Sequence, residues 1–543
     1  MKNRITTRGC ALLIAFVCGS SCTSNYLDIN TDPFEISKDQ MQADAYAIGA
    51  AMNAIAGTVV SPDVNTAQFT DCLLGGTMGG YMADSQDTWA NTISNYNPAD
   101  GWTNVFMASA HVMPVLYSNL TELKTVTEDP VPLAIAEVMK VCAMHRITDT
   151  YGPIPYLQVG EDGKLKVPYD SQEAIYTRMF EELNHAVGVL TEHRTESIAA
   201  TADYIYGGNV EKWIKLANSI KLRLAMRIVY ANRKMAQEMA ESAVAHEIGV
   251  ITSNDANAAF RSFGEKGNPL YVSVKYNEVQ AGDHEDGKAC ATGGDTHVAA
   301  DIACYMNGYN DPRRAAYFIP SEWDGMTYVG LRRGIVIPSL KTTGHKYSGV
   351  NIAIDSPVYW MNAAEVAFLM AEAKAIFGFD MGGDDARTLY ERGVRLSFEQ
   401  WGVKGVEAYL ADAESTPEKY TDPAGSNTYN NVLSTITIAW DENATPEQMQ
   451  ERIITQKWIA NWLLGNEAWA DYRRTGYPRL IPATAAGNKS GGIVDSEQGA
   501  RRMPYPADEY INNGENVQAA VTNLLKGADN MATKVWWDCK NQN

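Results

Sequence analysis

Residues 209–232 read NVEKWIKLANSIKLRLAMRIVYAN, and this stretch decides the fold class. Its apolar residues recur at steps of three and four, the spacing that places side chains on one face of an α-helix. The first stripe consists of Trp213, Leu216, Ile220, Leu224 and Ile228. A second stripe runs through Leu222, Ala225 and Val229, so we expect this helix to be covered on two sides. The stretch predicts a long buried helix and a mainly α-helical protein around it.

The same periodicity returns on both sides of this helix. Apolar residues share one face over residues 133–147, and Asp170 or Ser171 is placed to cap a further helix. We expect more helices over residues 361–377, 385–401 and 445–474. The first two of these are separated by a short glycine-containing break, the pattern of a helical hairpin. The sequence therefore predicts degenerate helical hairpins stacked as a solenoid.

Two long segments interrupt the helical pattern. Over residues 258–357 and 477–543, glycine, aspartate, tyrosine and arginine become more frequent and the helical period fades. Long insertions of irregular structure on a regular scaffold usually carry function. We therefore expect loop-rich excursions in these two segments.

Composition excludes several classes of protein. The chain has 543 residues, of which 45% are hydrophobic and 20% charged, fractions typical of a globular protein. Lysine and arginine total 45 against 65 aspartates and glutamates, which gives a formal net charge of −20. Such a surface repels the phosphate backbone of nucleic acids and anionic lipid headgroups. We expect neither as a direct partner.

The first residues direct the protein to the cell envelope. Lys2, Arg4 and Arg8 precede a short apolar run, and small residues then lead to Cys22. This is the pattern of a secretory signal peptide, and its apolar run is too short to span a membrane. A cysteine directly after the small residues predicts a lipoprotein, with residues 1–21 as signal peptide and Cys22 as the lipid-bearing residue. The alternative is ordinary cleavage that leaves Cys22 unmodified.

The remaining chain is expected to consist of a lipidated tether over residues 22–38 and a single helical domain over residues 39–543. Five cysteines follow Cys22, an odd number that argues against a disulfide framework. Cys142 lies in an apolar helical run and is assigned to the core. Whether Cys290 and Cys304 pair is left open by the sequence.

Several segments together resemble one family. They read NYLDINTDP (25–33), TDTYGPIPY (148–156), KWIKLANS (212–219) with RLAMR (223–227), DPRR (311–314), AAEV (363–366) with AEA (371–373), NEAWADYRRTGYP (466–478) and RRMPYP (501–506). In this order, and with Cys22 before them, they resemble the SusD/RagB nutrient-binding lipoproteins of Bacteroidetes. Each segment alone is a weak signal, and the match is specific because the segments extend over nearly the whole mature chain.

The resemblance implies a fold of tetratricopeptide-like helical pairs and a lipoprotein of the outer membrane that faces the cell exterior. It also implies a partner, a TonB-dependent transporter of the SusC type, on which the protein sits as a lid. Its role would be to capture glycans, or in some branches peptides, without catalysis and without a cofactor. The matching motifs are mostly scaffold and do not identify the ligand.

Aromatic residues in loop-like segments are the candidate ligand contacts. Sugars pack their C–H faces on aromatic rings and direct their hydroxyl groups to amide, carboxylate or arginine partners. One candidate segment, rich in glycine, asparagine and aspartate, contributes Tyr81, Trp89, Tyr96 and Trp102. A second candidate loop contributes Trp323, Tyr328 and Arg332. Four tryptophans on helical stripes are instead assigned to the core, namely Trp213, Trp458, Trp462 and Trp469.

No catalytic motif emerges from the sequence. Glu365 and Glu372 lie on one face of a helix, about 10 Å apart along its axis. Rotation of their side chains brings the carboxyl groups near the separation of an inverting glycosidase, so a helical glycoside hydrolase stays an alternative. The favoured interpretation is that both glutamates pair with basic residues on neighbouring helices. Gly75-Gly76 and Gly79-Gly80 lack the lysine of a phosphate loop and are assigned to tight turns.

No metal site is predicted either. The sequence cluster His284, Cys290, His297 and Cys304 has gaps of six and seven residues, unlike the short paired spacings of structural zinc sites. Acidic residues beside His284 lack the EF-hand pattern, so calcium binding is left open. A purely structural or adhesive surface protein is the remaining alternative to nutrient binding.

Overall fold

The structure is a computed structural model that describes residues 46–104, 106–107, 112–160, 166–261, 263–264, 267–279 and 290–540. The chain divides into two units, Met1–Ala47 and Ile48–Asn543, and the contacts reported below lie within the second. The predicted signal peptide, Cys22 and the tether over residues 22–38 lie outside the described residues, as does His284.

Helices dominate the described part of the chain, as predicted. In order, the α-helices are α4 (Tyr46–Ala56), α5 (Val64–Ala67), α6 (Met113–Val126), α7 (Pro130–Tyr151), α8 (Gln172–Glu192), α9 (Val210–Arg227), α10 (Arg233–Val244), α11 (Pro269–Val274), α12 (Ala300–Gly308), α13 (Arg314–Tyr317), α14 (Ala363–Phe377), α15 (Ala386–Gln400), α16 (Val406–Leu410), α17 (Pro446–Ala460), α18 (Gly465–Thr475) and α19 (Ala507–Asn523). A π-helical segment, η1 (Gln68–Gly76), continues α5, and short 3₁₀ turns are η2 (Asp100–Trp102), η3 (Ala200–Ala202), η4 (Asn254–Ala256) and η6 (Gly344–Lys346).

Strands are short and occur in antiparallel pairs. They are β1 (Met82–Asp84) with β3 (Thr296–Val298), β2 (Ala258–Phe260) with β6 (Val358–Met361), and β4 (Phe318–Ile319) with β5 (Gly349–Val350). The pairing of β1 with β3 sets Asp84 opposite Thr296. The β1–β3 pair joins the first excursion to the segment that follows η1, and the β2–β6 pair closes this excursion at its base, whereas β4 and β5 pair within it.

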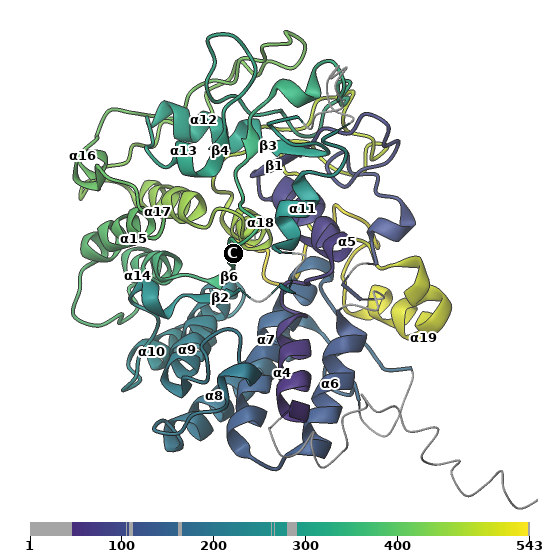
Figure 1. The fold of residues 1–543 in the computed structure, drawn as a ribbon, viewed down its shortest axis with the longest axis vertical. Coiled ribbons are helices and arrows are strands. Elements are labelled where there is room, and N and C mark those ends of the chain that lie inside the picture. Colours follow the sequence, from purple (N-terminus) through teal and green to yellow (C-terminus); the bar gives the residue numbers. More distant parts are fainter. Residues whose placement is uncertain are drawn as a thin grey trace, which may run out of the picture. The chain divides into compact units, whose positions relative to one another are not determined.

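The helices pack as neighbouring pairs. Helices α7, α8, α9 and α10 lie side by side in chain order, and α14 packs on both α15 and α17 (Figure 1). The side chains of Ser171 and Asn209 accept hydrogen bonds from the first turns of α8 and α9, so each helix starts at a local capping residue. The predicted mainly α fold of tetratricopeptide-like helical hairpins is confirmed.

Two boundaries differ from the prediction. Residues 445–474 form two helices, α17 and α18, because the chain turns between them at Leu463, whose φ is 75°. The turn lets α18 pack on η1, where a Cβ on Gly465 would lie 2.3 Å from the carbonyl carbon of Gly75. In the second excursion, residues 507–523 form α19, although the sequence showed no clear helical period there.

The first of the two glycine pairs before Tyr81 does not have the role that was predicted. Gly75 and Gly76 lie inside η1, and a Cβ on Gly79 would come within 2.6 Å of the carbonyl oxygen of Gly465. Only Gly80, with φ of 77°, has the left-handed conformation of a turn residue. The glycines therefore mark a close approach of two helical segments. The assignment to a tight turn is wrong for Gly75 and Gly76, which are helical, whereas Gly79 and Gly80 lie in a turn as predicted.

Candidate functional site

Tyr81 belongs to the protein core. Its ring is fully buried and stacks on Trp458, with ring centroids 5.6 Å apart. Its hydroxyl group donates a hydrogen bond of 2.5 Å to the carbonyl oxygen of Trp458. Because both the ring and its polar tip are occupied by protein, the prediction that Tyr81 faces a ligand is corrected.

Tyr96 and Arg332 are also buried, with exposed fractions of 5% and 6%. The guanidinium group of Arg332 donates hydrogen bonds to the carbonyl oxygens of Asn427 (3.0 Å) and Pro482 (2.8 Å), and it lies over the ring of Tyr429. It therefore joins three loop segments. The structure places neither Tyr96 nor Arg332 on a ligand-accessible surface, which corrects the sequence-based placement of both.

Trp89 and Trp102 form the first aromatic group that reaches solvent. Both rings are half-buried and meet edge to face, with centroids 5.2 Å apart. Trp102 packs in turn against Phe69 of η1, also at 5.2 Å. The loop that carries Trp89 is fixed at its start by Gln86, whose side-chain amide donates to Asp295 over 2.9 Å. The pair is thus a firm aromatic surface on a short loop.

Trp323 and Tyr328 form the second group, on a loop closed by a hydrogen bond from Ser321 N to Thr327 O of 2.9 Å. Trp323 is half-buried, meets Tyr347 edge to face at 5.7 Å, and lies below the ammonium group of Lys346. A cation above an indole ring is held by the charge distribution of the ring. The ring of Trp323 is therefore held by two neighbouring side chains, Tyr347 and Lys346.

One segment supports both aromatic loops. The backbone N–H of Leu340 donates to the Asp87 carboxylate over 3.0 Å, two residues before Trp89. The backbone N–H of Glu322, one residue before Trp323, donates to the Lys346 carbonyl over 2.8 Å. Residues 339–347 thus connect the two loops that the sequence selected independently.

A cavity of about 470 Å³ opens beside Tyr328. Its wall includes Asn307 and Arg314 from α12 and α13, and Glu418 from a distant loop. The Asn307 amide donates to Glu418 (2.9 Å) and to the carbonyl oxygen of Tyr328 (2.8 Å), and burial raises the pKa of Glu418. An aromatic ring, an amide, a carboxylate and a guanidinium group therefore surround one space, the set of groups that sugar hydroxyls and ring faces require.

Sequence reasoning missed Asn307, Arg314 and Glu418 as candidate residues. Arg314 was assigned to a scaffold motif, and the other two carry no local signal. Glu418 lies 111 residues from Asn307 in the chain, and only the fold brings them together.

The carboxylates considered for hydrolysis are occupied by arginines. Arg223 of α9 contacts Glu365 at 2.7 Å, and Arg474 of α18 contacts Glu372 at 2.7 Å, with all four side chains buried. The prediction that both glutamates pair with basic residues on neighbouring helices is confirmed. Cys142 and the four core tryptophans are buried as predicted.

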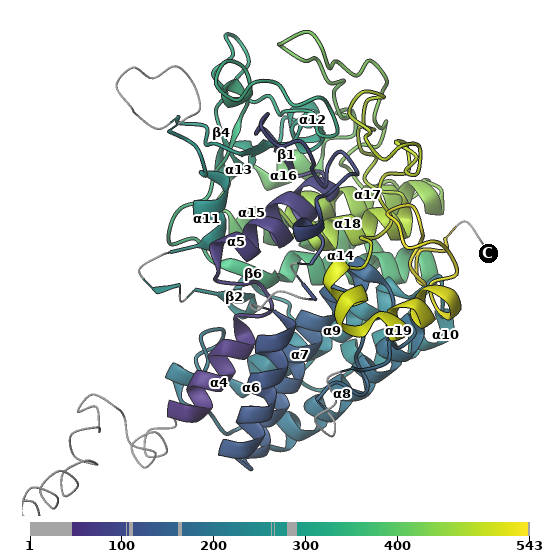
Figure 2. The same ribbon diagram turned by 90° about the vertical axis from the view of Figure 1, so that its right-hand side faces the viewer.

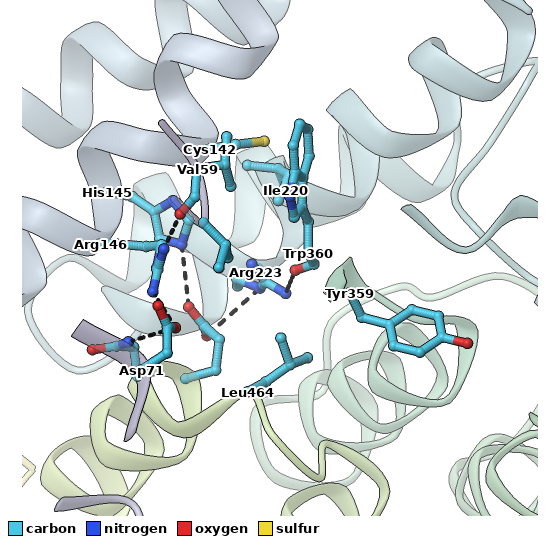
Figure 3. Close-up of a pocket in the computed structure, with 13 residues that line it drawn as sticks. Val59, Asp71, Cys142, His145, Arg146, Ile220, Arg223, Tyr359, Trp360 and Leu464 are labelled. Carbon is cyan, nitrogen blue, oxygen red and sulfur yellow. Dashed lines mark hydrogen bonds and ion pairs between the residues drawn. The ribbon is translucent and has the colours of Figure 1, made fainter. Parts of the chain in front are cut away.

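A small cavity of about 30 Å³ lies among charged residues at the centre of the helical scaffold (Figure 3). Arg146 contacts Asp71 at 2.5 Å, and His145 contacts Glu467 at 3.1 Å. This volume leaves room for water but is far below the roughly 300 Å³ at which ligand pockets start. The charged groups of this cavity are therefore part of the scaffold.

The remaining candidate residues are the cysteines and the possible metal ligands. Cys290 and Cys304 are each buried and free, so they do not form a disulfide with each other. In the described residues, no group of three or more histidine, cysteine, aspartate or glutamate side chains is arranged to hold a metal ion. None of the described helices combines the length and the apolar character needed to cross a bilayer.

Comparison with known proteins gives a consistent result. Residues 28–538 match the family model described as SusD-like, "Susd and RagB outer membrane lipoprotein". The structure is similar to that of a SusD homologue from Bacteroides uniformis, with 60% sequence identity, a TM-score of 0.87, and coverage of 91% of this chain and 99% of that one. A SusD homologue from Bacteroides thetaiotaomicron is 37% identical with a TM-score of 0.81, again covering 91% of this chain and 99% of that one.

A third similar structure is that of a chitin-binding SusD homologue from Flavobacterium johnsoniae. It is 35% identical, with a TM-score of 0.81, and the match covers 91% of this chain and 99% of that one. No curated protein matches the chain significantly.

Proposed function

Since the chain belongs to the SusD-like family of outer membrane lipoproteins, a family of non-catalytic binding proteins, we propose that it captures nutrient oligosaccharides at the cell surface. It would be anchored through lipid on Cys22, face the cell exterior, and pass its ligand to a SusC-like TonB-dependent transporter. A peptide ligand is the second candidate within the same role.

The observation that carries the glycan proposal is the pair of half-buried tryptophans on loops held by one segment. Trp89 and Trp323 each keep part of an indole ring free while their loops are fixed by hydrogen bonds to residues 339–347. A fixed ring loses little conformational entropy when a sugar packs on it. The cavity beside Tyr328 adds hydrogen-bonding groups next to the second loop.

Two points favour a sugar over a peptide. Sugar rings offer flat C–H faces for the two tryptophans, and the cavity wall combines an amide, a carboxylate and a guanidinium group, which suits hydroxyl groups that both donate and accept. A similar structure, 35% identical, is that of a chitin-binding SusD homologue. Oligosaccharides of N-acetylglucosamine are therefore the first ligands to test.

The binding experiment is isothermal titration calorimetry of the mature protein with chito-oligosaccharides, malto-oligosaccharides and a panel of peptides. We expect heat of binding with at least one glycan series, and a loss of affinity of about tenfold or more in Trp323→Ala and Trp89→Ala. The matched control is Trp440→Ala, a half-buried tryptophan packed on Tyr390 away from both loops. If only peptides bound, the ligand would be a peptide and not a glycan. If a folded protein gave no heat of binding with any glycan or peptide, the proposal would be refuted.

Two further experiments address location and partner. Mass spectrometry of the N-terminal peptide from native membranes should show an acylated Cys22, whereas Cys22→Ser should leave the membrane fraction. Affinity purification from envelopes should recover a β-barrel transporter. Turnover of any glycan by the purified protein would instead establish the hydrolase alternative.

A further inference from the structure

A second, separate cavity of about 600 Å³ lies between the start of α8 and the C-terminal segment that follows α19. Figure 2 shows α19, the helix that directly precedes this segment, in yellow at the C-terminal end of the colour scale. The cavity wall includes Ser171 and Glu173 of the α8 start, Lys526, Lys534, Trp536 and Asp538. None of its lining residues belongs to the two aromatic loops or to the cavity beside Tyr328.

Trp536 gives this cavity a fixed aromatic wall. The ring is half-buried and packs on Tyr176 of α8 at 6.1 Å, and its backbone N–H donates to the Gln172 side chain over 2.9 Å. The next residue, Trp537, is fully buried, and its indole N–H donates to Asp149 over 2.8 Å. Because its neighbour is locked in the core, Trp536 is held in place before any ligand arrives.

Two lysines at the cavity offer a place for an anionic group. Lys526 is exposed at the rim, and Lys534 lies 3.9 Å from Asp538, beyond hydrogen-bond distance. The Asp538 carboxylate pairs more closely with Arg501, at 2.6 Å, and Lys534 approaches its other oxygen only at 3.9 Å, so Asp538 neutralises Lys534 only in part. Glu173 is the remaining carboxylate of the wall, and it suits a sugar hydroxyl group as an acceptor. With Lys526 and Lys534 against Glu173 and Asp538, the formal charge of the wall is balanced, whereas the whole chain carries −20.

We propose that this cavity binds an acidic sugar, a pyranose ring that carries a carboxylate, with the ring against Trp536 and the carboxylate at Lys526 and Lys534. Its volume accommodates one or two sugar units, since ligand pockets for small molecules start at roughly 300 Å³. The proposal does not depend on the ligand of the aromatic loops, because it concerns a different surface.

The test is saturation-transfer difference NMR on the mature protein with three probes, namely glucuronic acid, glucose and acetate. Glucuronic acid should give the strongest signal, glucose a weaker one from ring packing alone, and acetate none at the same concentration. Sodium chloride should weaken the glucuronic acid signal, because salt screens the lysine charges.

Variants of the cavity residues test whether the NMR signal of glucuronic acid arises at this cavity. Trp536→Ala should abolish it, and the double variant Lys526→Gln, Lys534→Gln should weaken glucuronic acid affinity about tenfold while leaving the glucose signal unchanged. The matched controls are Trp89→Ala and Lys234→Gln, the latter an exposed lysine on α10, and both should keep the full signal. The lysine variants alter exposed or rim positions, so they test the site even if Trp536→Ala disturbs the fold.

Three results would overturn the inference. They are no glucuronic acid signal, a signal lost in Trp89→Ala but kept in Trp536→Ala, and equal binding of glucuronic acid and glucose that the lysine variants do not change. The second result would place acidic sugars on the aromatic loops and would leave the proposed function intact.

Discussion

Glu467 is the residue whose removal should damage the scaffold in a measurable way. Its carboxylate, on α18, contacts His145 at 3.1 Å, Arg223 at 3.5 Å, and Arg227. The side chain is 7% exposed, so these interactions are hardly screened by solvent. Figure 3 shows His145 and Arg223 directed toward the same buried space. We predict that Glu467→Gln, which keeps the shape and removes the charge, lowers the free energy of unfolding.

The size of the loss in unfolding free energy depends on which carboxylates Arg223 and Arg227 still contact in the variant. Removing one member of a buried ion pair costs about 3–5 kcal/mol, because the other charge is left without compensation. In this cluster Arg227 still contacts Asp149 at 2.9 Å, and Arg223 still contacts Glu365 at 2.7 Å. The loss should therefore lie at the lower end of this range, about 3 kcal/mol.

The pH dependence has a defined sign. Burial alone would raise the pKa of Glu467, but the charges of Arg223 and Arg227 and the hydrogen bond from His145 outweigh it and hold the pKa well below 4.5. A carboxyl group with a lowered pKa stabilises the folded state fully above its unfolded pKa, about 4.3, and loses that contribution as the pH falls through the folded value. The difference between wild type and Glu467→Gln should be equal at pH 7 and pH 5.5 and should shrink toward pH 3.

The assay is urea unfolding followed by circular dichroism at these three pH values. Glu407→Gln is the control, because Glu407 pairs with Arg395 on the surface and its loss should change stability little. A difference below about 1 kcal/mol for Glu467→Gln at pH 7, or one that grows on acidification, would refute the reasoning.

Three other substitutions test the packing and the local structure. A Cβ on Gly393 of α15 would lie 2.7 Å from the ring of Phe368, so Gly393→Ala should destabilise by about 1–3 kcal/mol and lower the thermal midpoint. Thr445 forms a capping box at the start of α17, and Thr445→Ala should cost about 1 kcal/mol in urea unfolding. Burial raises the pKa of Asp84 to about 7, so its ionised form is unfavourable in the folded state. Asp84→Asn should therefore raise the free energy of unfolding at pH 8 by about 2–4 kcal/mol. Urea unfolding at lower pH should show that this gain disappears toward pH 4.

The sequence predicted the regular part of the molecule well, because helical periodicity is a local property. The stripe with Trp213 places that side chain in the core, and Ser171 begins α8 as a cap, since both depend on residues within one or two turns. The prediction of one helix over residues 445–474 was wrong because the break at Leu463 serves a contact with η1, about 390 residues earlier in the chain.

The candidate site was predicted less well for the same reason. A segment rich in glycine and asparagine suggested exposure for Tyr81, yet its ring is covered by Trp458, 377 residues away. The glycines before Tyr81 do not make the segment flexible. They let its backbone approach the backbone at Gly465 closely. Burial of a loop residue is set by partners that the local sequence does not contain, so exposure of Trp89 and Trp323 was established only by the fold.

The motifs that reveal the family also explain why they do not reveal the ligand. Asp149, in the segment TDTYGPIPY, accepts hydrogen bonds from Tyr176 (2.5 Å), Arg227 (2.9 Å) and Trp537 (2.8 Å). One carboxylate thus connects α7 to α8, to α9 and to the C-terminal segment, and changing it would disturb all four at once. Such residues are constrained by the scaffold whatever the protein binds. Trp323 and Tyr328 belong to none of these motifs, so exchanging them would test the proposed glycan site without disturbing the scaffold contacts of Asp149.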